Sequence, residues 1–282
     1  MSEAAATPAL REVQGPSAVG GGRQRFFDLL WLVSVTEFKR TYFGTVLGYM
    51  WSLLRPLLLF AVLLFVFTKI FRLGHDVPHY PVLLLFDVVL FGFFSESTTG
   101  AVGSVVAQES IVRKTQFPRM VIPLSVVVTA LFNLGMNLIV VVIFILAFGV
   151  TPMWTWLFFP LIVAVLFVFS TAVSLLLSSL YVRFRDTLII WSVMATALFY
   201  ATPVLYPIEK VPSSYRDVIL LNPLTPLFVQ ARHWVIDPSA PTAVDAAGGW
   251  LHLLAPITLF AAICGLGAWY FNREAPRVAE EL

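Results

Sequence analysis

The sequence predicts an all-α integral membrane protein with six transmembrane helices, an amphipathic interfacial helix before them and a re-entrant hairpin before the last one. Of its 282 residues, 59% are hydrophobic and 12% are charged, whereas soluble proteins carry roughly 25% charged residues. The apolar residues also gather in runs of about 20, the length that a helix needs to cross a ~30 Å hydrocarbon layer. Lipid is therefore the main solvent of this chain.

The order of the apolar runs divides the chain into one membrane domain and two tails. Residues 1–24 are rich in Ala, Gly and Pro and are expected to be a disordered cytoplasmic tail, residues 25–272 form the membrane domain, and residues 273–282 form a second cytoplasmic tail. Pro56 is expected near the start of its helix, where a missing N–H costs little. The six runs cover approximately residues 46–71, 82–107, 121–150, 154–181, 188–201 and 250–271.

The distribution of basic residues predicts the orientation. With the N-terminus inside, most of the 18 lysines and arginines fall on the cytoplasmic side, as the positive-inside rule requires. Both ends of the chain are then cytoplasmic, which is consistent with an even number of crossings. The outer side receives only Lys69, Arg72, Lys210, Arg216 and Arg232.

The stretch 202–234 is apolar but is interrupted by five prolines, so its helices are expected to be too short to span the bilayer. Irregular backbone at membrane depth is tolerated only where protein or water satisfies its polar groups. The stretch is therefore predicted to be a re-entrant hairpin that enters from the outside. Its prolines are Pro203, Pro207, Pro212, Pro223 and Pro226.

Residues 25–42 are predicted to form an amphipathic helix on the inner membrane surface. At helical spacing, one face carries a stripe of apolar residues, with Thr36, Glu37 and Arg40 on the opposite face. Aromatic side chains in such a stripe favour the headgroup boundary. The stripe consists of Phe27, Trp31, Val35, Phe38 and Tyr42.

The sequence gives no sign of enzymatic chemistry. It contains no GxxxxGK[ST] loop for nucleotide phosphates and no GxSxG nucleophile elbow. Its four histidines lack metal-ligand spacing, so neither a metal nor a cofactor is expected on this chain. The single cysteine, Cys264, is interpreted as a buried hydrophobe. The net charge of +2 is too small to indicate a nucleic-acid partner.

Two short basic loops remain as candidates for function, at residues 108–119 and 181–186. One interpretation is that they only fix the topology through their positive charge. The other is that Phe117 and Phe184, exposed beside arginines, dock into grooves of a cytoplasmic partner.

At this point several ordered motifs resemble a known family. YFGTVLGYMWSLLRPL at 42–57 resembles the opening of ABC type-2 exporter permeases for polysaccharides and polyol-phosphate polymers, and RKTQFPR at 113–119 resembles their first coupling loop. Arg185-Asp186, TPVLYP at 202–207 and LNPL at 221–224 are similar to the family's final third. The last two motifs add Tyr206 and Asn222 to the predicted hairpin. The likeness covers residues 25–272.

The resemblance implies a homodimer in the cell inner membrane, driven by two cytoplasmic ABC ATPase subunits that carry ATP and Mg. The implied substrate is an undecaprenyl-diphosphate-linked polymer. The amphipathic helix would form a gate for the lipid headgroup through Phe27, Trp31 and Phe38, with Lys39 and Arg40 either attracting phosphate or simply anchoring the helix to membrane lipids. The implied ATPase-coupling residues are Arg113, Lys114, Phe117, Pro118, Arg119, Arg183, Phe184, Arg185 and Asp186.

Family pores also use aromatic rings as sugar-stacking surfaces, which makes Tyr49, Trp51, Phe91, Phe93 and Phe94 possible pore residues, with core or lipid-facing packing as the alternative for each. Two carboxylates, Asp87 and Glu96, lie inside the second apolar run. An ionised carboxylate costs ~3 kcal/mol at the bilayer centre. Each is therefore expected to face the pore or a partner, unless Asp87 lies near the outer interface. The family usually has a small or apolar residue at the position of Asp87.

Other functions remain open at this stage. Asp87, Glu96 and the broken stretch after residue 202 would also suit a proton- or ion-coupled secondary transporter. Drug- or lipid-exporting ABC permeases share the topology but are not expected to carry all of these motifs. A membrane glycosyltransferase or lipid phosphatase would need a carboxylate or histidine cluster at one interface, which the sequence does not suggest.

Overall fold

The computed structural model describes residues 22–42, 48, 50–72, 77–109 and 117–274, and every regular element within them is helical. The all-α membrane fold is thereby confirmed. The longer helices are α1 (Arg23–Tyr42), α2 (Met50–Phe65), α3 (Tyr80–Val102), α6 (Val121–Ala147), α7 (Phe159–Arg183), α8 (Thr187–Ala201) and α12 (Trp250–Glu274). The shorter ones are η1 (Val66–Ile70), α4 (Ser104–Ala107), η3 (Trp154–Phe158), η4 (Ile208–Lys210), α9 (Ser213–Leu220), α10 (Leu224–Val235) and α11 (Ala243–Ala247).

The domain boundaries shift slightly. Helix α1 begins at Arg23, inside the predicted tail, and α12 continues to Glu274. Residues 1–21 and 275–282, which include most of both predicted tails, lie outside the described residues.

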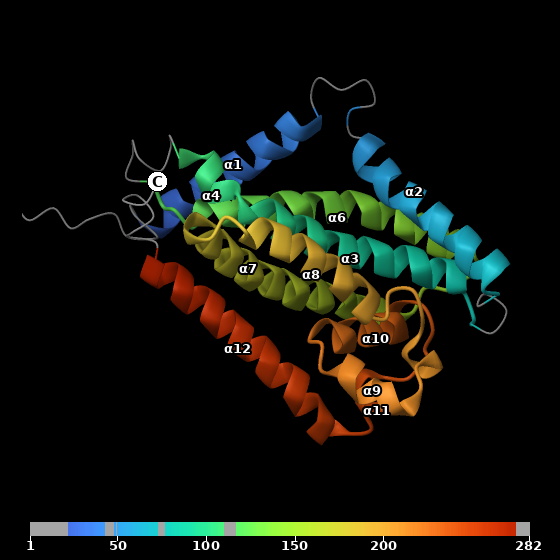
Figure 1. Cartoon of the computed structure of the whole chain (residues 1–282). Coiled ribbons are helices and arrows are strands. Elements are labelled where there is room, and N and C mark those ends of the chain that lie inside the picture. The colour runs from blue at the N-terminus through green and yellow to red at the C-terminus, as the bar shows by residue number, and fades with distance from the viewer. Residues whose placement is uncertain (1–21, 43–47, 49, 73–76, 110–116, 275–282) are drawn as a thin grey trace, which may run out of the picture.

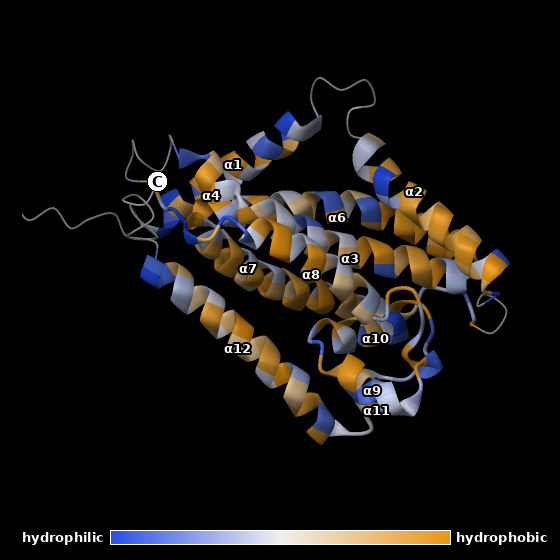
Figure 2. Ribbon diagram, viewed as in Figure 1, coloured by the Kyte–Doolittle hydropathy of each residue, from blue (hydrophilic) through white to orange (hydrophobic). Residues whose placement is uncertain are grey.

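Five stretches are long and apolar enough to span a bilayer: Met50–Ile70, Tyr80–Val102, Val121–Ala147, Trp154–Arg183 and Trp250–Glu274. Helix α8 has 15 residues, which corresponds to about 22 Å at 1.5 Å per residue and falls short of a ~30 Å hydrocarbon layer. The sixth crossing therefore stays a prediction. Figure 2 shows hydrophobic residues along the middle of the bundle and hydrophilic ones gathered towards its two ends.

The two ends of the bundle differ in construction (Figure 1). One end holds α1, α4 and the last turn of α12, whereas the short helices α9, α10 and α11 lie at the other. The segment between α8 and α12 is thus built from short helices, as its prolines predict. Its depth in a membrane is not defined by the fold, so a re-entrant path stays a prediction.

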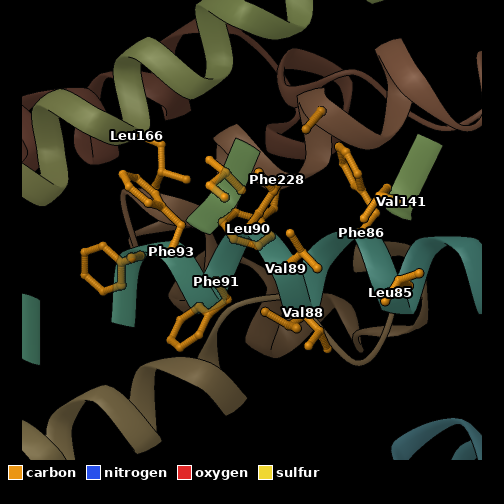
Figure 3. Close-up of a cluster of buried hydrophobic side chains, with 14 of the residues drawn as sticks. Leu85, Phe86, Val88, Val89, Leu90, Phe91, Phe93, Val141, Leu166 and Phe228 are labelled. Carbon is orange, nitrogen blue, oxygen red and sulfur yellow. The ribbon is translucent and has the colours of Figure 1, made fainter. Parts of the chain in front are cut away.

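Helix α3 is the centre of the bundle. It is apolar around its whole circumference, which favours burial on every side, and it packs against α2, α6, α7 and α8. Figure 3 shows its side chains interlocked with Val141 of α6, Leu166 of α7 and Phe228 of α10. The short outer helix α10 is therefore joined to the same core as the long helices.

Several hydroxyl groups inside this core make hydrogen bonds, both within their own helix and across helices. Ser97 and Thr98 of α3 donate to the carbonyls of Phe93 and Phe94 one turn earlier. Ser174 of α7 donates to the Ser97 carbonyl over 3.2 Å, and the Trp191 indole of α8 donates to the Thr98 hydroxyl over 3.1 Å. Such bonds hold helices together in lipid, where apolar burial discriminates little between partners.

Helix α2 contains its proline well inside the helix rather than near its start. Because α2 begins at Met50, Pro56 stands in its second turn, and the expectation that it lies near the helix start, where a proline costs little, is wrong. A proline there leaves the carbonyl four residues earlier, that of Ser52, without its helical donor. The side-chain amide of Asn137 on α6 donates to this carbonyl over 3.2 Å. This hydrogen bond replaces the missing helical one and also links α2 to α6.

Helices α7 and α12 approach each other closely at Gly267. A Cβ atom on this glycine would overlap the backbone carbonyl of Ala172 on α7. Small residues at helix contacts in membranes allow this kind of approach. Two residues earlier, Gly265 has no neighbour within 4 Å of its would-be Cβ atom.

We expect Gly267→Ala to lower the thermal unfolding midpoint of the purified protein in detergent, because overpacking a tight contact costs about 1–3 kcal/mol. Gly265→Ala is the matched control and should leave the midpoint unchanged or raise it, since alanine is the better helix former. Equal midpoints for the two variants would contradict the packing described here.

Candidate functional site

The connection between α7 and α8 is a tight turn that presents an aromatic ring. Only three residues separate the two helices, and the backbone N–H and hydroxyl of Thr187 both donate to the Phe184 carbonyl, over 3.1 and 2.6 Å. The Phe184 side chain is 56% exposed, and the Arg183 guanidinium lies 5.8 Å from its ring centroid. Arg185 and Asp186 are also exposed. The turn is therefore a fixed aromatic and basic projection.

The first basic loop is different. Phe117 is half-buried and packs against a small cluster of Val105, Ile122 and Val182, so the expectation that it is an exposed knob is wrong. Pro118 and Arg119 are buried as well. Arg113 and Lys114 lie outside the described residues. Of the two aromatic residues predicted to be exposed for docking, only Phe184 is exposed.

Helix α1 packs on α6 through part of its predicted stripe. Trp31 and Phe38 both contact the ring of Phe132 edge to face, at 5.6 Å between centroids. Phe27 is exposed. Lys39 and Arg40 are exposed, and Arg40 lies 3.8 Å from Glu37. One part of the aromatic face of α1 therefore packs against α6, and another part is exposed. The cationic side chains of Lys39 and Arg40 remain available for contact.

The possible pore aromatics separate into two groups. Phe91, Phe93 and Phe94 are buried in the core of the chain, and the Phe94 ring stacks on Phe169 at 5.8 Å. This favours the packing alternative for these three residues. Trp51 is exposed on α2, and Tyr49 lies outside the described residues.

Glu96 is exposed although it lies inside a spanning helix. The side-chain amide of Asn133 on α6 donates to its carboxylate over 2.5 Å, and the Asn133 carbonyl oxygen accepts from the Tyr42 hydroxyl of α1 over 3.0 Å. Burial, followed by the nearby Glu96 charge, raises the pKa of the Tyr42 phenol. The phenol therefore stays protonated and acts as the donor of this chain of hydrogen bonds.

Asp87 lies near the other end of α3 and is buried, with 1% exposure. Its Oδ1 atom has no hydrogen-bond partner among the described residues and faces a small cavity that Arg232 of α10 also lines. The Arg232 guanidinium interacts electrostatically with the carboxyl group. The partner that an intramembrane carboxylate requires is thus supplied by the same chain.

Arg232 holds a charged cluster together. Its Nη1 atom donates to both carboxylate oxygens of Glu209, over 3.0 and 2.9 Å, and its Nη2 atom lies 3.8 Å from Asp237. One guanidinium therefore pairs with two carboxylates, and Asp87 lines the same small cavity as Arg232. The cluster joins α3, η4 and α10.

The predicted hairpin residues shape the backbone in this region. Asn222 donates to the Thr202 hydroxyl over 2.8 Å and accepts from the Leu224 N–H over 3.0 Å, which starts α10 directly after Pro223. The Tyr206 hydroxyl donates to the Tyr200 carbonyl. Pro203 and Pro207 are buried beside the Asp87 cavity. Each of these residues therefore has a structural role.

Sequence reasoning missed Arg232, Asn133 and Asn137 as partners of the site. A signal was present for the asparagines, because two amides at an i, i+4 spacing inside an apolar run place polar groups on one helix face. No such signal exists for Arg232, because Glu209 and Asp87 lie 23 and 145 positions away from it in the sequence. Within the described ranges, no group of three or more His, Cys, Asp or Glu side chains could hold a metal ion.

We expect Arg232→Gln to lower the thermal unfolding midpoint strongly. Removing the cation leaves the Glu209 and Asp237 carboxylates without their partner, and breaking a buried ion pair costs ~3–5 kcal/mol. Because Glu209 is partly exposed, solvent screens its charge, and we expect a smaller loss of unfolding free energy of at least about 2 kcal/mol. Arg72→Gln, at an exposed position, is the control and should leave the midpoint unchanged. An unchanged midpoint for Arg232→Gln would argue against the cluster.

Comparison with known proteins shows to which family the chain belongs. Residues 28–234 match the model of the ABC-2 type transporter family. The chain is 33% identical to the O-antigen export system permease protein RfbA of Klebsiella pneumoniae over 207 residues, covering 73% of this chain and 79% of that protein. The Myxococcus xanthus protein of the same name is 34% identical over 209 residues, covering 73% and 80%.

A more distant relative is the polysialic acid transport protein KpsM of Escherichia coli, 23% identical over 242 residues, or 84% of this chain and 90% of that protein. The family match covers well over half of the chain and includes most of α1, the α7–α8 turn and α10 as far as Trp234. This multi-pass membrane protein therefore belongs to the ABC-2 type transporter family.

Proposed function

We propose that the chain is the permease subunit of an ATP-driven exporter that moves a lipid-linked polysaccharide from the cytoplasm across the cell inner membrane. The polymer is of the O-antigen, galactan or teichoic-acid type and is carried on undecaprenyl diphosphate. Membership of the ABC-2 type family supports the permease role. The printed names of the relatives, O-antigen export and polysialic acid transport, support the substrate class.

One structural observation carries the proposal: the exposed Phe184 on a rigid turn between two long helices. A permease without its own nucleotide site must receive work by contact with an ATPase. Because the turn is fixed by the bonds of Thr187 to the Phe184 carbonyl, a push on the ring is transmitted to α7 and α8. Phe184, flanked by Arg183 and Arg185, is the docking residue in this proposal.

In the working assembly, two copies of the chain pair in the membrane and two cytoplasmic ATPase subunits bind ATP and Mg. In this proposal both chain ends face the cytoplasm, and so does the end of the bundle that holds α1, α4 and the α7–α8 turn (Figure 1). The exposed cations of α1, Lys39 and Arg40, attract the diphosphate of the lipid carrier at the inner surface. Arg113, Lys114 and the rest of the first basic loop complete the ATPase contact.

We expect Phe184→Asp to reduce copurification of the ATPase subunit by more than about tenfold, because a buried aromatic anchor is typically worth 2 kcal/mol or more at an interface. Membrane insertion should be unaffected. Tyr215→Asp, which changes an exposed aromatic residue at the opposite end of the bundle, is the matched control and should copurify normally. Normal copurification of the Phe184 variant would refute the docking role.

We expect the double variant Lys39→Ala and Arg40→Ala to lower the amount of polymer at the cell surface while the ATPase still copurifies. Each cation near an anionic surface contributes about 1 kcal/mol, so the pair corresponds to roughly a tenfold or greater effect. The measurement is surface polymer per assembled exporter. Wild-type export by this variant would mean that the two residues do not meet the substrate.

A further inference from the structure

Two opposite charges stand exposed on the inner halves of spanning helices. Glu96 lies on α3 and Arg55 on α2, and both side chains are exposed in the single chain. Turning an ionised side chain towards lipid costs roughly 2.5–3.5 kcal/mol at the helix centre. A face that presents both charges is therefore turned towards water in the assembled exporter and not towards hydrocarbon.

The carboxylate of Glu96 is held in place by hydrogen bonds from buried residues. Asn133 and Tyr42 are both buried, and each is engaged in the hydrogen-bond chain that ends on the carboxylate Oε1 atom. Three helices, α1, α3 and α6, contribute to this support. The second oxygen, Oε2, makes no hydrogen bond among the described residues, and the residue as a whole is exposed. This arrangement fixes one acceptor in a defined direction.

The position of Arg55, the hydrogen-bond donor, is fixed by a separate contact between helices. Pro56 frees the Ser52 carbonyl, and Asn137 binds it, so the first turns of α2 are fastened to α6 close to Asn133. Arg55 stands directly before this proline and interacts electrostatically with both Glu96 and Tyr42. Acceptor and donor are therefore brought together by two asparagines one turn apart on α6.

The chemistry of this pair selects its ligand. A carboxylate only accepts hydrogen bonds and a guanidinium only donates them, whereas a hydroxyl group can do both at once. A sugar diol can donate to Glu96 and accept from Arg55, and both bonds are charge-assisted. A phosphate would meet repulsion from Glu96, and an apolar ligand would leave both charges without partners.

We propose that Arg55 and Glu96 form a binding site for the hydroxyl groups of a neutral glycan segment, with Tyr42 and Asn133 as positioning residues. The inference rests on the proposed function, since it names what passes this point of the exporter. The site holds one sugar by two hydrogen bonds. As the polymer moves, these bonds break and form again with the next sugar. It thus discriminates hydroxyl-rich polymer from the lipid that surrounds it.

The test uses the complete exporter in cells. Glu96→Gln keeps the bond from Asn133 but removes the charge, and we expect surface polymer per assembled exporter to fall about tenfold, as for the loss of one charge-assisted hydrogen bond. Arg55→Gln should have a similar effect. Asp217→Asn, an exposed carboxylate on α9, is the control and should export normally. In all variants the ATPase subunit should copurify normally.

A second readout does not depend on export. In inside-out vesicles and a Cys264→Ser background, a water-soluble charged thiol reagent should label Glu96→Cys at least about fivefold faster than Ile257→Cys, an apolar position exposed on α12, because thiolates react only where water reaches them. Equal labelling rates, or wild-type export by Glu96→Gln, would overturn the site alone. A wild-type exporter that moves no glycan would overturn the proposed function together with the site.

Discussion

The burial of helix α3 determines how the rest of the molecule is arranged. Its apolar side chains face every direction, so other helices must surround it, and α2, α6, α7 and α8 do so. In lipid this packing depends on close contact and on hydrogen bonds between helices, because lipid chains compete equally for apolar surface. The bonds among Ser97, Thr98, Ser174 and Trp191 meet that requirement. The central helix therefore sets the positions of all groups that it carries.

Two of those groups are carboxylates that point in opposite directions. Asp87 and Glu96 are nine residues apart, which places them on opposite faces of an ideal helix and about 13.5 Å apart along its axis. Asp87 faces Arg232 and the short outer helices, whereas Glu96 faces Asn133 and the first two helices. A movement of α3 would thus act on both ends of the bundle. This geometry is consistent with a conduit whose inner and outer ends respond together.

Much of this architecture could be predicted from the sequence, because lipid imposes long apolar runs and prolines interrupt them. The amphipathic stripe, the helix order and the broken stretch after Thr202 follow from local patterns. Long-range partners could not be predicted. Pro56 appeared to stand at a helix start because nothing local reveals that α2 begins at Met50. Phe117 looked exposed because its contacts with Val105 and Val182 come from distant segments. Likewise, Arg232 shares the cavity of Asp87 although 145 positions separate them in the chain.

The central claim is that this chain is a passive conduit moved by a separate ATPase. The most direct measurement reconstitutes the purified permease in lipid vesicles with lipid-linked polysaccharide and follows polymer translocation with and without the ATPase subunit and ATP. The account predicts translocation only when both are present, and none on a proton or sodium gradient alone. Translocation by the permease alone under such a gradient would contradict it and would indicate a secondary transporter.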